Sequence, residues 1–200
     1  MRGTKTAAML LLIFLLTSCS GLQVQRDLKH ADVAQSYKSS LSTAAEFSPE
    51  SRCVLQGVSK TWVTLDFTES TPIVKLPSGL NASALCLSVP AGSQAMELLY
   101  DARGGLTYHE LIMVSPSLQF LDADYQLIKD VPVPHLSPAD TFNGLGLRGV
   151  TVLTTGLAKA RYVVVYVHPD SLDGSVTVQT GVAAIPVPFG PYGKVKLRFQ

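Results

Sequence analysis

The amino-acid sequence predicts an all-β fold, a single antiparallel β-sandwich of jelly-roll type over residues 53–200. From Cys53 onward, short β-branched and aromatic runs recur about every 8 to 14 residues, the strand spacing of a sandwich. Clusters of Pro, Gly, Asn and Asp separate these runs, and none of the runs has helical periodicity. The 200-residue chain is 46% hydrophobic and only 16% charged, so it is predicted to bury a core rather than to be disordered.

A secretory leader is predicted over residues 1–18. Two basic residues precede the apolar run Ala7–Leu16, which at about ten residues is too short to cross a bilayer as a helix. The sequence Leu-Thr-Ser-Cys that ends at Cys19 resembles the lipobox of bacterial lipoproteins. This resemblance implies that Cys19 is lipidated and becomes the first residue of the mature protein. The alternative is an ordinary secretory signal with a chance cysteine.

The lipoprotein resemblance also implies a location. Because Ser20 rather than Asp follows Cys19, the implied site is the periplasmic leaflet of the outer membrane. The two or three acyl chains of such proteins make membrane attachment effectively permanent, since each buried methylene contributes about 0.8 kcal/mol. The expected partner of the anchor is therefore the membrane itself.

The segment from the lipidated Cys19 to residue 52 is predicted to be a polar tether. It is rich in Ser, Gln and Ala, and it is weakly helical at best around residues 32–47. We expect it to lift the sandwich domain of residues 53–200 away from the membrane.

The predicted strands are short and are placed by their β-branched and aromatic residues. The segment Val131–Pro134 is expected to be an extended connection or an edge, because its prolines cannot donate ladder hydrogen bonds. In chain order the predicted strands are Trp62–Phe67, Ile73–Leu76, Ala84–Val89, Ala95–Tyr100, Glu110–Val114, Leu118–Leu121, Leu147–Thr154, Arg161–His168 and Lys194–Phe199.

Two of these runs predict where their strands lie in the sandwich. In Arg161–His168 both alternate sets are apolar, which indicates a central strand covered on both faces. In Lys194–Phe199 apolar residues alternate strictly with three cations, which predicts one buried face and one basic face. We interpret the basic face as a solvated one whose lysines discourage edge-to-edge pairing; contact with an anionic lipid or lipopolysaccharide is the alternative.

Cys53 and Cys86 remain as a pair once Cys19 is lipidated. In an oxidising compartment thiols that meet usually pair, and a bridge here would contribute about 3 to 4 kcal/mol in the chain-entropy model. The alternative is that Cys86, within an apolar run, is a buried free thiol. The sequence leaves both readings open.

Charge and motifs predict no nucleic-acid partner, catalytic residue, metal or cofactor. The leader contains two of the 16 basic residues, so the mature chain has 14 basic and 15 acidic residues and a charge of −1. This provides no field that attracts nucleic acid. Gly144–Gly149 matches G-x-G-x-x-G, but it follows a loop and precedes a predicted strand rather than a helix. The four histidines lack zinc-site spacing.

Exposed aromatic rings are the candidates for ligand contact, because sugar-binding clefts in β-sandwiches stack pyranose rings on aromatics. Aromatic residues make up only 8% of the chain, so most of them are expected in the core. The candidates for glycan stacking are Trp62, Tyr100, Tyr108, Tyr125 and Tyr192.

The middle of the chain contains a set of short segments whose order and spacing are informative when taken together: Lys75–Leu80, Leu87–Gly92, Met96–Leu99, Ser115–Asp122, the connection from Val133 to Phe142, Gly146–Gly149 and Arg161–Val165. Over residues 72–178 this set is similar to the maltose operon periplasmic protein (MalM) family. The resemblance implies a periplasmic protein linked to maltose or maltodextrin uptake, and it carries over no binding or catalytic residues. Longer family members add a charged, helical C-terminal segment beyond the position that matches Gln200, so the partner of that segment is not carried over as an expectation for this chain.

We therefore expect a non-catalytic periplasmic lipoprotein that is an accessory of maltose or maltodextrin transport. Its partner would be a maltodextrin or a protein of the uptake system, held near the membrane where tethering raises its effective concentration. The alternative is a structural or protein-interaction lipoprotein of the cell envelope that has no sugar ligand.

Overall fold

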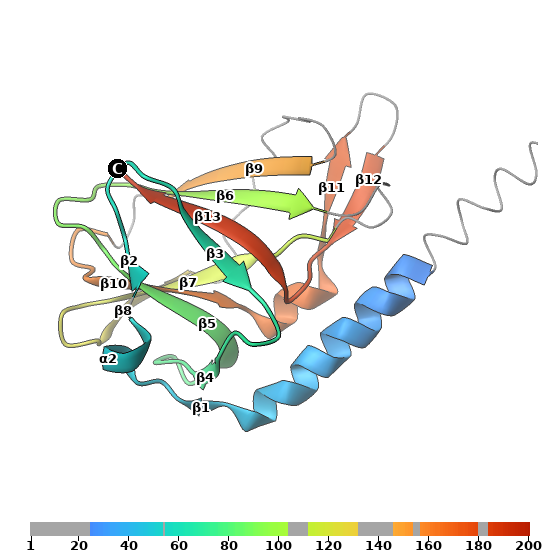
Figure 1. Cartoon of the computed structure of the whole chain (residues 1–200), viewed down its shortest axis with the longest axis horizontal. Coiled ribbons are helices and arrows are strands. Elements are labelled where there is room, and N and C mark those ends of the chain that lie inside the picture. Colours follow the sequence, from blue (N-terminus) through green and yellow to red (C-terminus); the bar gives the residue numbers. More distant parts are fainter. Residues whose placement is uncertain (1–24, 54, 104–111, 132–145, 154–156, 180–183) are drawn as a thin grey trace, which may run out of the picture.

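The structure, a computed structural model, describes residues 25–53, 55–103, 112–131, 146–153, 157–179 and 184–200. In this part of the chain β-strands are the main secondary structure, and one long helix covers residues 25–40 (Figure 1). The predicted all-β class is confirmed. Within the described residues, no helix combines the length and the apolar composition needed to cross a membrane.

The first sheet is mixed rather than purely antiparallel. Its central strands pair antiparallel, but the two short strands β1 and β2, which precede them in the chain, pair parallel with β4 and β5. In spatial order the sheet contains β1 (Ala45–Glu46), β4 (Ile73–Lys75), β5 (Asn81–Ser88), β10 (Tyr162–Val167), β7 (Pro116–Leu121) and β8 (Leu127–Val131), with β2 (Leu55–Gln56) also paired to β5.

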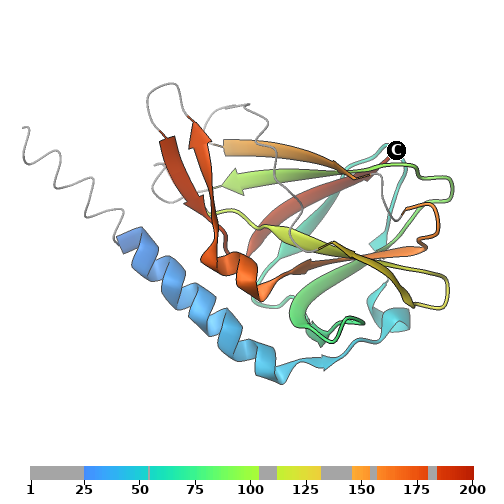
Figure 2. The same ribbon diagram turned by 180° about the vertical axis from the view of Figure 1, so that it is seen from behind.

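The second sheet packs against the first and is antiparallel throughout its described pairs (Figures 1 and 2). Its spatial order is β3 (Val63–Phe67), β13 (Gly193–Phe199), β6 (Met96–Arg103) and β9 (Gly146–Leu153). A separate hairpin joins β11 (Ser175–Gln179) to β12 (Ala184–Pro188). Short helical segments are η1 (Leu41–Thr43), α2 (Pro49–Arg52) and η3 (Pro169–Asp173).

The strand β10 is buried on both faces, as its sequence predicts. It lies between β5 and β7 in the first sheet. Val163, Val165 and Val167 face the main core between the sheets, whereas Val164 and Tyr166 belong to a second apolar cluster on the opposite face. A continuous apolar run is what a strand covered on both faces requires, because neither set of alternate side chains reaches water.

The strand β13 has the predicted alternation but not the predicted position. Its apolar residues are fully buried in the main core. However, β13 lies between β3 and β6, so its cations do not protect a sheet edge, and that part of the interpretation is wrong. The face is partly solvated, as predicted, since the Lys194 side chain is half exposed. The cations instead meet acids on the flanking strands: Lys194 lies 3.4 Å from Asp66 on β3, and Arg198 pairs with Glu97 on β6.

The predicted polar tether is wrong for residues 25–52, which pack on the sandwich. Ala34 and Tyr37 of the long helix are buried, with Tyr37 1% exposed in the main core. The Tyr37 hydroxyl donates to the carbonyl of Val167 (3.2 Å) and accepts from the Ser83 amide (2.9 Å). The buried face of the helix is narrow and contains a small and an aromatic residue, so its periodic signal is weak.

Cys53 and Cys86 form a disulfide, so the free-thiol alternative does not apply. Their Cα atoms are 4.4 Å apart. Cys53 directly follows α2, and Cys86 lies in β5 with its side chain in the second apolar cluster. The bridge therefore fixes the segment that contains α2 over the outer face of the first sheet.

Candidate functional site

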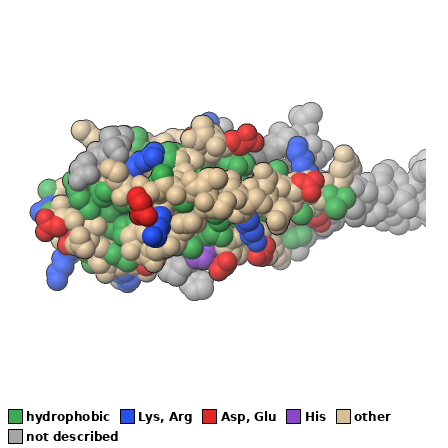
Figure 3. Space-filling model, turned by 90° about the horizontal axis from the view of Figure 1, so that it is seen from below, with side chains coloured by type: hydrophobic (Ala, Val, Ile, Leu, Met, Phe, Trp, Pro, Cys, Tyr) green, Lys and Arg blue, Asp and Glu red, His purple; other side chains and the backbone are tan. Residues whose placement is uncertain are grey.

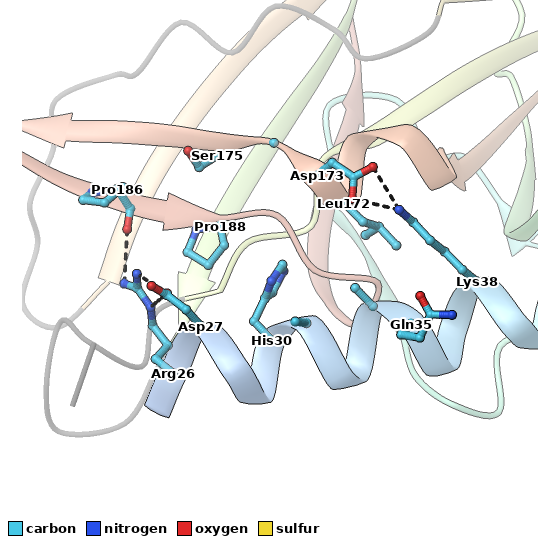
Figure 4. Close-up of a pocket in the computed structure, with 13 residues that line it drawn as sticks. Arg26, Asp27, His30, Gln35, Lys38, Leu172, Asp173, Ser175, Pro186 and Pro188 are labelled. Carbon is cyan, nitrogen blue, oxygen red and sulfur yellow. Dashed lines mark hydrogen bonds and ion pairs between the residues drawn. The ribbon is translucent and has the colours of Figure 1, made fainter. Parts of the chain in front are cut away.

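A groove of about 540 Å³ lies between the long helix and the β11–β12 hairpin (Figure 4). At one end, the Arg26 guanidinium donates to the Pro186 carbonyl (3.2 Å) and pairs with Asp27 (2.7 Å). At the other end, the Lys38 ammonium donates to both carboxylate oxygens of Asp173 at 2.8 and 2.9 Å. The helix is thus fixed to β12 at one end and to η3, which precedes the hairpin, at the other, and the groove lies open between these contacts.

His30 divides this groove from a second cavity. Its side chain points from the helix toward the hairpin, and its Nε2 lies 2.5 Å from the Phe189 carbonyl oxygen, so this nitrogen is the donor (Figure 4). His30 lines both cavities. The helix therefore forms one wall of each cavity, and the imidazole is fixed at their boundary.

The second cavity, of about 410 Å³, brings an aromatic ring together with charged groups. Tyr192 lines it with its ring edge-on to Tyr37, at a centroid distance of 6.3 Å. Asp66 and Lys194, both half exposed, lie at the same cavity and pair with each other at 3.4 Å. We call this space the Tyr192 cavity; apolar side chains from the helix and from residues 112–114 complete its wall.

Local backbone constraints place Tyr192 at the cavity. It lies in the run Gly190-Pro-Tyr-Gly193 at the start of β13. Gly193 has φ +147°, and a Cβ there would lie 2.9 Å from Cγ2 of Val114. A Cβ at Gly190 would collide with Ile112. Only glycines allow this segment to approach residues 112–114 so closely, and that approach presents Tyr192 between them and the helix.

The chemistry of the Tyr192 cavity suits a neutral polyhydroxylated ligand. An aromatic ring offers a stacking surface, and a carboxylate and an ammonium offer an acceptor and donors for hydroxyl groups. Burial raises the pKa of the Tyr192 phenol above 10.0, and the charge of Glu69 adds to the rise. The phenol is therefore protonated at neutral pH and available as a donor. The volume lies within the range of about 300–1,000 Å³ that is usual for small-ligand pockets.

The three predicted stacking aromatics whose side chains the structure describes, Trp62, Tyr125 and Tyr192, do not lie together. Trp62 lies beside the outer face of the second sheet with the Arg198 guanidinium 4.5 Å from its ring centroid. Tyr125 is in the turn between β7 and β8 and stacks on Tyr162 at 4.6 Å. Of the five candidates, Tyr192 is the one found at a described cavity. The Tyr100 side chain, Tyr108 and the predicted lipidation site Cys19 lie outside the described residues.

A buried polar network lies on the outer face of the first sheet, and sequence reasoning did not predict it. The Tyr166 hydroxyl donates to Asp130 (2.9 Å), and the Gln119 amide donates to the same carboxylate (3.0 Å). Burial, and secondarily the hydrogen bond to Asp130, raise the pKa of Tyr166. The only sequence signal is the polar alternation of Ser117 and Gln119 within an otherwise apolar strand.

Charged groups are distributed evenly over the face shown in Figure 3, where cations and anions are interspersed. Among the described residues, no group of three or more His, Cys, Asp or Glu side chains is placed to hold a metal ion. Sequence reasoning missed the roles of His30, Asp66 and Lys38, because each depends on an element far away in the chain. The glycines that flank Tyr192 are the one signal that could have singled out its cavity.

Comparison with protein-family models gives no match, and comparison with curated proteins gives none. Among solved structures, the chain is similar to the enzymatically active domain of bacteriophage CBA120 tailspike protein 4, with a TM-score of 0.26 and 10% sequence identity. The match covers 69% of this chain and spans 17% of the tailspike chain. A likeness at this level carries no argument about activity or ligand.

Proposed function

We propose that the protein is a periplasmic lipoprotein, anchored at Cys19, that assists maltose or maltodextrin uptake without catalysing a reaction. In this proposal the Tyr192 cavity holds a glucosyl unit of the oligosaccharide near the membrane. Tethering a weak binding site in this way raises the local concentration of its ligand without any additional contact.

The proposed location is supported by two parts of the chain. The lipobox-like Leu-Thr-Ser-Cys sequence provides the anchor at Cys19. The Cys53–Cys86 disulfide is the kind of bond that persists in an oxidising compartment such as the periplasm and is rare in the cytosol. The proposed link with carbohydrate uptake rests on the resemblance of segments within residues 72–178 to the MalM family.

The observation that carries the proposed ligand is the geometry of the Tyr192 cavity. The half-buried ring of Tyr192 reaches the cavity from the loop before β13, the carboxylate of Asp66 from β3, and the ammonium of Lys194 from β13. Sugar recognition combines an apolar ring face with several hydrogen bonds, and this is the described cavity that offers both. The groove between the helix and the hairpin has no aromatic lining residue except the imidazole of His30.

Calorimetric titration of the lipidated protein with a maltodextrin tests the proposed ligand. The detergent should have no sugar headgroup, so that it does not compete. We expect wild-type protein to release heat and Tyr192→Ala to lose binding at least about tenfold, which is 1.4 kcal/mol. Trp62→Ala is the matched control, since it removes an aromatic ring away from the cavity, and it should bind like wild type. Absence of heat with wild-type protein would contradict the proposed ligand.

The proposed lack of catalysis has a separate test. After prolonged incubation with catalytic amounts of protein, we expect the chain-length distribution of the maltodextrin to be unchanged. Shortened or extended chains would show that the protein is an enzyme and would overturn this part of the proposal.

A second candidate function is a structural or protein-interaction lipoprotein of the envelope. The observation that favours it is the open groove of Figure 4, which is flanked by the paired charges of Arg26, Asp27, Lys38 and Asp173 rather than by stacking aromatics. This candidate would be favoured if the calorimetric titration with maltodextrin gives no heat and the incubation leaves the maltodextrin chain lengths unchanged.

A further inference from the structure

We propose that the end of the domain formed by the beginning of the long helix lies against the lipid surface that holds Cys19. The inference rests on the proposed lipidation of Cys19, and it adds an interaction surface and an orientation to that proposal. The partner is the bilayer surface itself, contacted by Leu28 and Lys29.

The length of chain between the anchor and the docked helix carries the argument. Cys19 and Gln25 are six residues apart, and even a fully extended chain spans at most about 3.6 Å per residue. Gln25 therefore lies within about 22 Å of the anchored residue. Had residues 19–52 been a free tether, the same arithmetic would allow the domain to move about 120 Å away.

The docking contacts begin almost at the first described residue of the helix. Arg26 is held by the Pro186 carbonyl, and its side chain is only 8% exposed. His30, Tyr37 and Lys38 add contacts along the next three turns, to Phe189, to Val167 and Ser83, and to Asp173 respectively. No free segment remains in residues 26–38 that could lengthen the connection without breaking several of these contacts.

The exposed face of the same helical turn suits a lipid interface. Leu28 is 63% exposed, the most exposed large hydrophobic side chain in the described part of the chain, and Lys29 beside it is also exposed. An apolar side chain enters the boundary between headgroups and acyl chains, while a lysine stem lies along it with the ammonium at the phosphates. Asp32 is exposed one turn further on, so attraction by net charge is small. The anchor, not charge, is what holds this surface to the lipid.

The structure also shows which end of the molecule lies farthest from the beginning of the long helix. Figures 1 and 2 show the beginning of the long helix and the C-terminus at opposite ends of the longest axis. Val58 lies at the C-terminal end, where the amide of Lys60 donates to the Phe199 carbonyl (2.8 Å), and its side chain is 48% exposed. Leu28 and Val58 are thus two exposed apolar positions, one at each end of the molecule.

Tryptophan quenching in vesicles tests the orientation. The chain has a single tryptophan, so Trp62→Phe provides a background into which Leu28→Trp or Val58→Trp is introduced in the full, lipidated protein. The vesicles contain phosphatidylethanolamine and phosphatidylglycerol with a nitroxide quencher on a fraction of the headgroups. We expect the lipid quencher to reduce fluorescence at position 28 at least threefold more strongly than at position 58. Equal quenching at the two positions would overturn the inference.

An insertion and an anchor variant separate the possible causes. Twenty Gly and Ser residues inserted between Gly21 and Leu22 lengthen the connection and should remove the difference between the two positions; a difference that persists would show that the short connection is not its cause. If the lipidated protein binds vesicles but quenching is equal, the orientation fails and the proposed function stands. If the wild-type protein is not acylated and does not bind vesicles, the proposed anchor and the orientation fail together.

Discussion

Tyr37 joins the long helix to the sandwich through its hydroxyl as well as its ring. The hydroxyl donates to the Val167 carbonyl at the end of β10 and accepts from the amide and the hydroxyl of Ser83 on β5. The ring is 1% exposed and contacts the edge of Tyr192. One side chain thus connects the helix, two strands of the first sheet and the Tyr192 cavity.

We expect Tyr37→Phe to lower the free energy of unfolding by about 1 to 3 kcal/mol, because it leaves buried backbone groups without a partner. Urea unfolding followed by circular dichroism measures the change. Tyr162→Phe is the matched control: its half-buried ring stacks on Tyr125, and the stacking survives loss of the hydroxyl. Equal losses in the two variants would contradict this role for the Tyr37 hydroxyl.

We expect the buried phenol of Tyr166 to make the folded protein less stable in alkaline solution. Burial raises its pKa in the folded state above the ordinary value of 10.0, so folding favours the protonated phenol. The stabilisation from this shift is fully present below about pH 10 and is lost as the pH rises above it. The pKa values of Tyr37 and Tyr192 shift in the same direction.

The expected result is that the free energy of unfolding falls between pH 8 and pH 11 in wild-type protein, and falls less steeply in Tyr166→Phe. That variant should start from a lower value at pH 8, because Asp130 loses a hydrogen-bond donor. Urea titrations at both pH values provide the measurement. The same pH dependence in the variant and in wild type would show that Tyr166 is not responsible.

At the scale of elements, the sequence predicts the strands that have clear apolar patterns. The strands β3, β5, β10 and β13 lie close to their predicted ranges, because alternating or continuous apolar runs report burial directly. The predicted strand Glu110–Val114 is reduced, in its described part, to a bridge between Met113 and Phe189.

Elements whose burial depends on distant partners were not predicted. The strand β12 contains Pro186 and Pro188, which read as a loop. Within the described pairs β11 is its only partner strand, so β12 lies at a sheet edge, where proline is tolerated. The carbonyls of Pro186 and Pro188 accept from the Arg26 guanidinium and the Met113 amide instead of from a further strand. The strand β8 has exposed Leu127 and Ile128 and shows no buried alternation. The long helix buries only a narrow face. The residues that line the Tyr192 cavity come from distant parts of the chain. The sequence alone therefore identified Tyr192 as a candidate for ligand contact but not the residues that share its cavity.

We expect Ala34→Asp to release the long helix, because position 34 is buried in the main core and an unpaired carboxylate there costs several kcal/mol. Trypsin should then cleave after Lys29 and Lys38 at least about tenfold faster than in wild type, the factor expected for 1.4 kcal/mol. Ser36→Asp introduces the same charge at an exposed position of the same helix and serves as the control. Unchanged cleavage in Ala34→Asp would contradict docking of the helix.

At the scale of the whole molecule, docking changes what the proposed lipoprotein can reach. With the helix packed on the sandwich, the domain stays close to its anchor and presents its C-terminal end away from it (Figure 2). The Tyr192 cavity lies along the helix, between the two ends. A ligand held there would remain within roughly one domain diameter of the membrane, about 40 Å for a chain of this size.

We expect Cys19→Ala to remove the protein from the membrane fraction, because the variant cannot carry the proposed acyl anchor. Fractionation of cells followed by mass determination of the protein provides the measurement. The variant should appear in the soluble fraction or accumulate with its leader attached. A processed wild-type protein without acyl mass, sedimenting in the same way as the variant, would contradict lipidation at Cys19.

Retention of labelled maltodextrin on vesicles tests the central claim most directly, because it requires both the anchor and the cavity. Vesicles that carry the lipidated wild-type protein should sediment with more maltodextrin than bare vesicles, whereas vesicles incubated with Cys19→Ala or carrying Tyr192→Ala should not. Trp62→Ala should retain the sugar as wild type does. Vesicles with bound wild-type protein that retain no more maltodextrin than bare vesicles would contradict the claim that this lipoprotein holds oligosaccharide at the membrane.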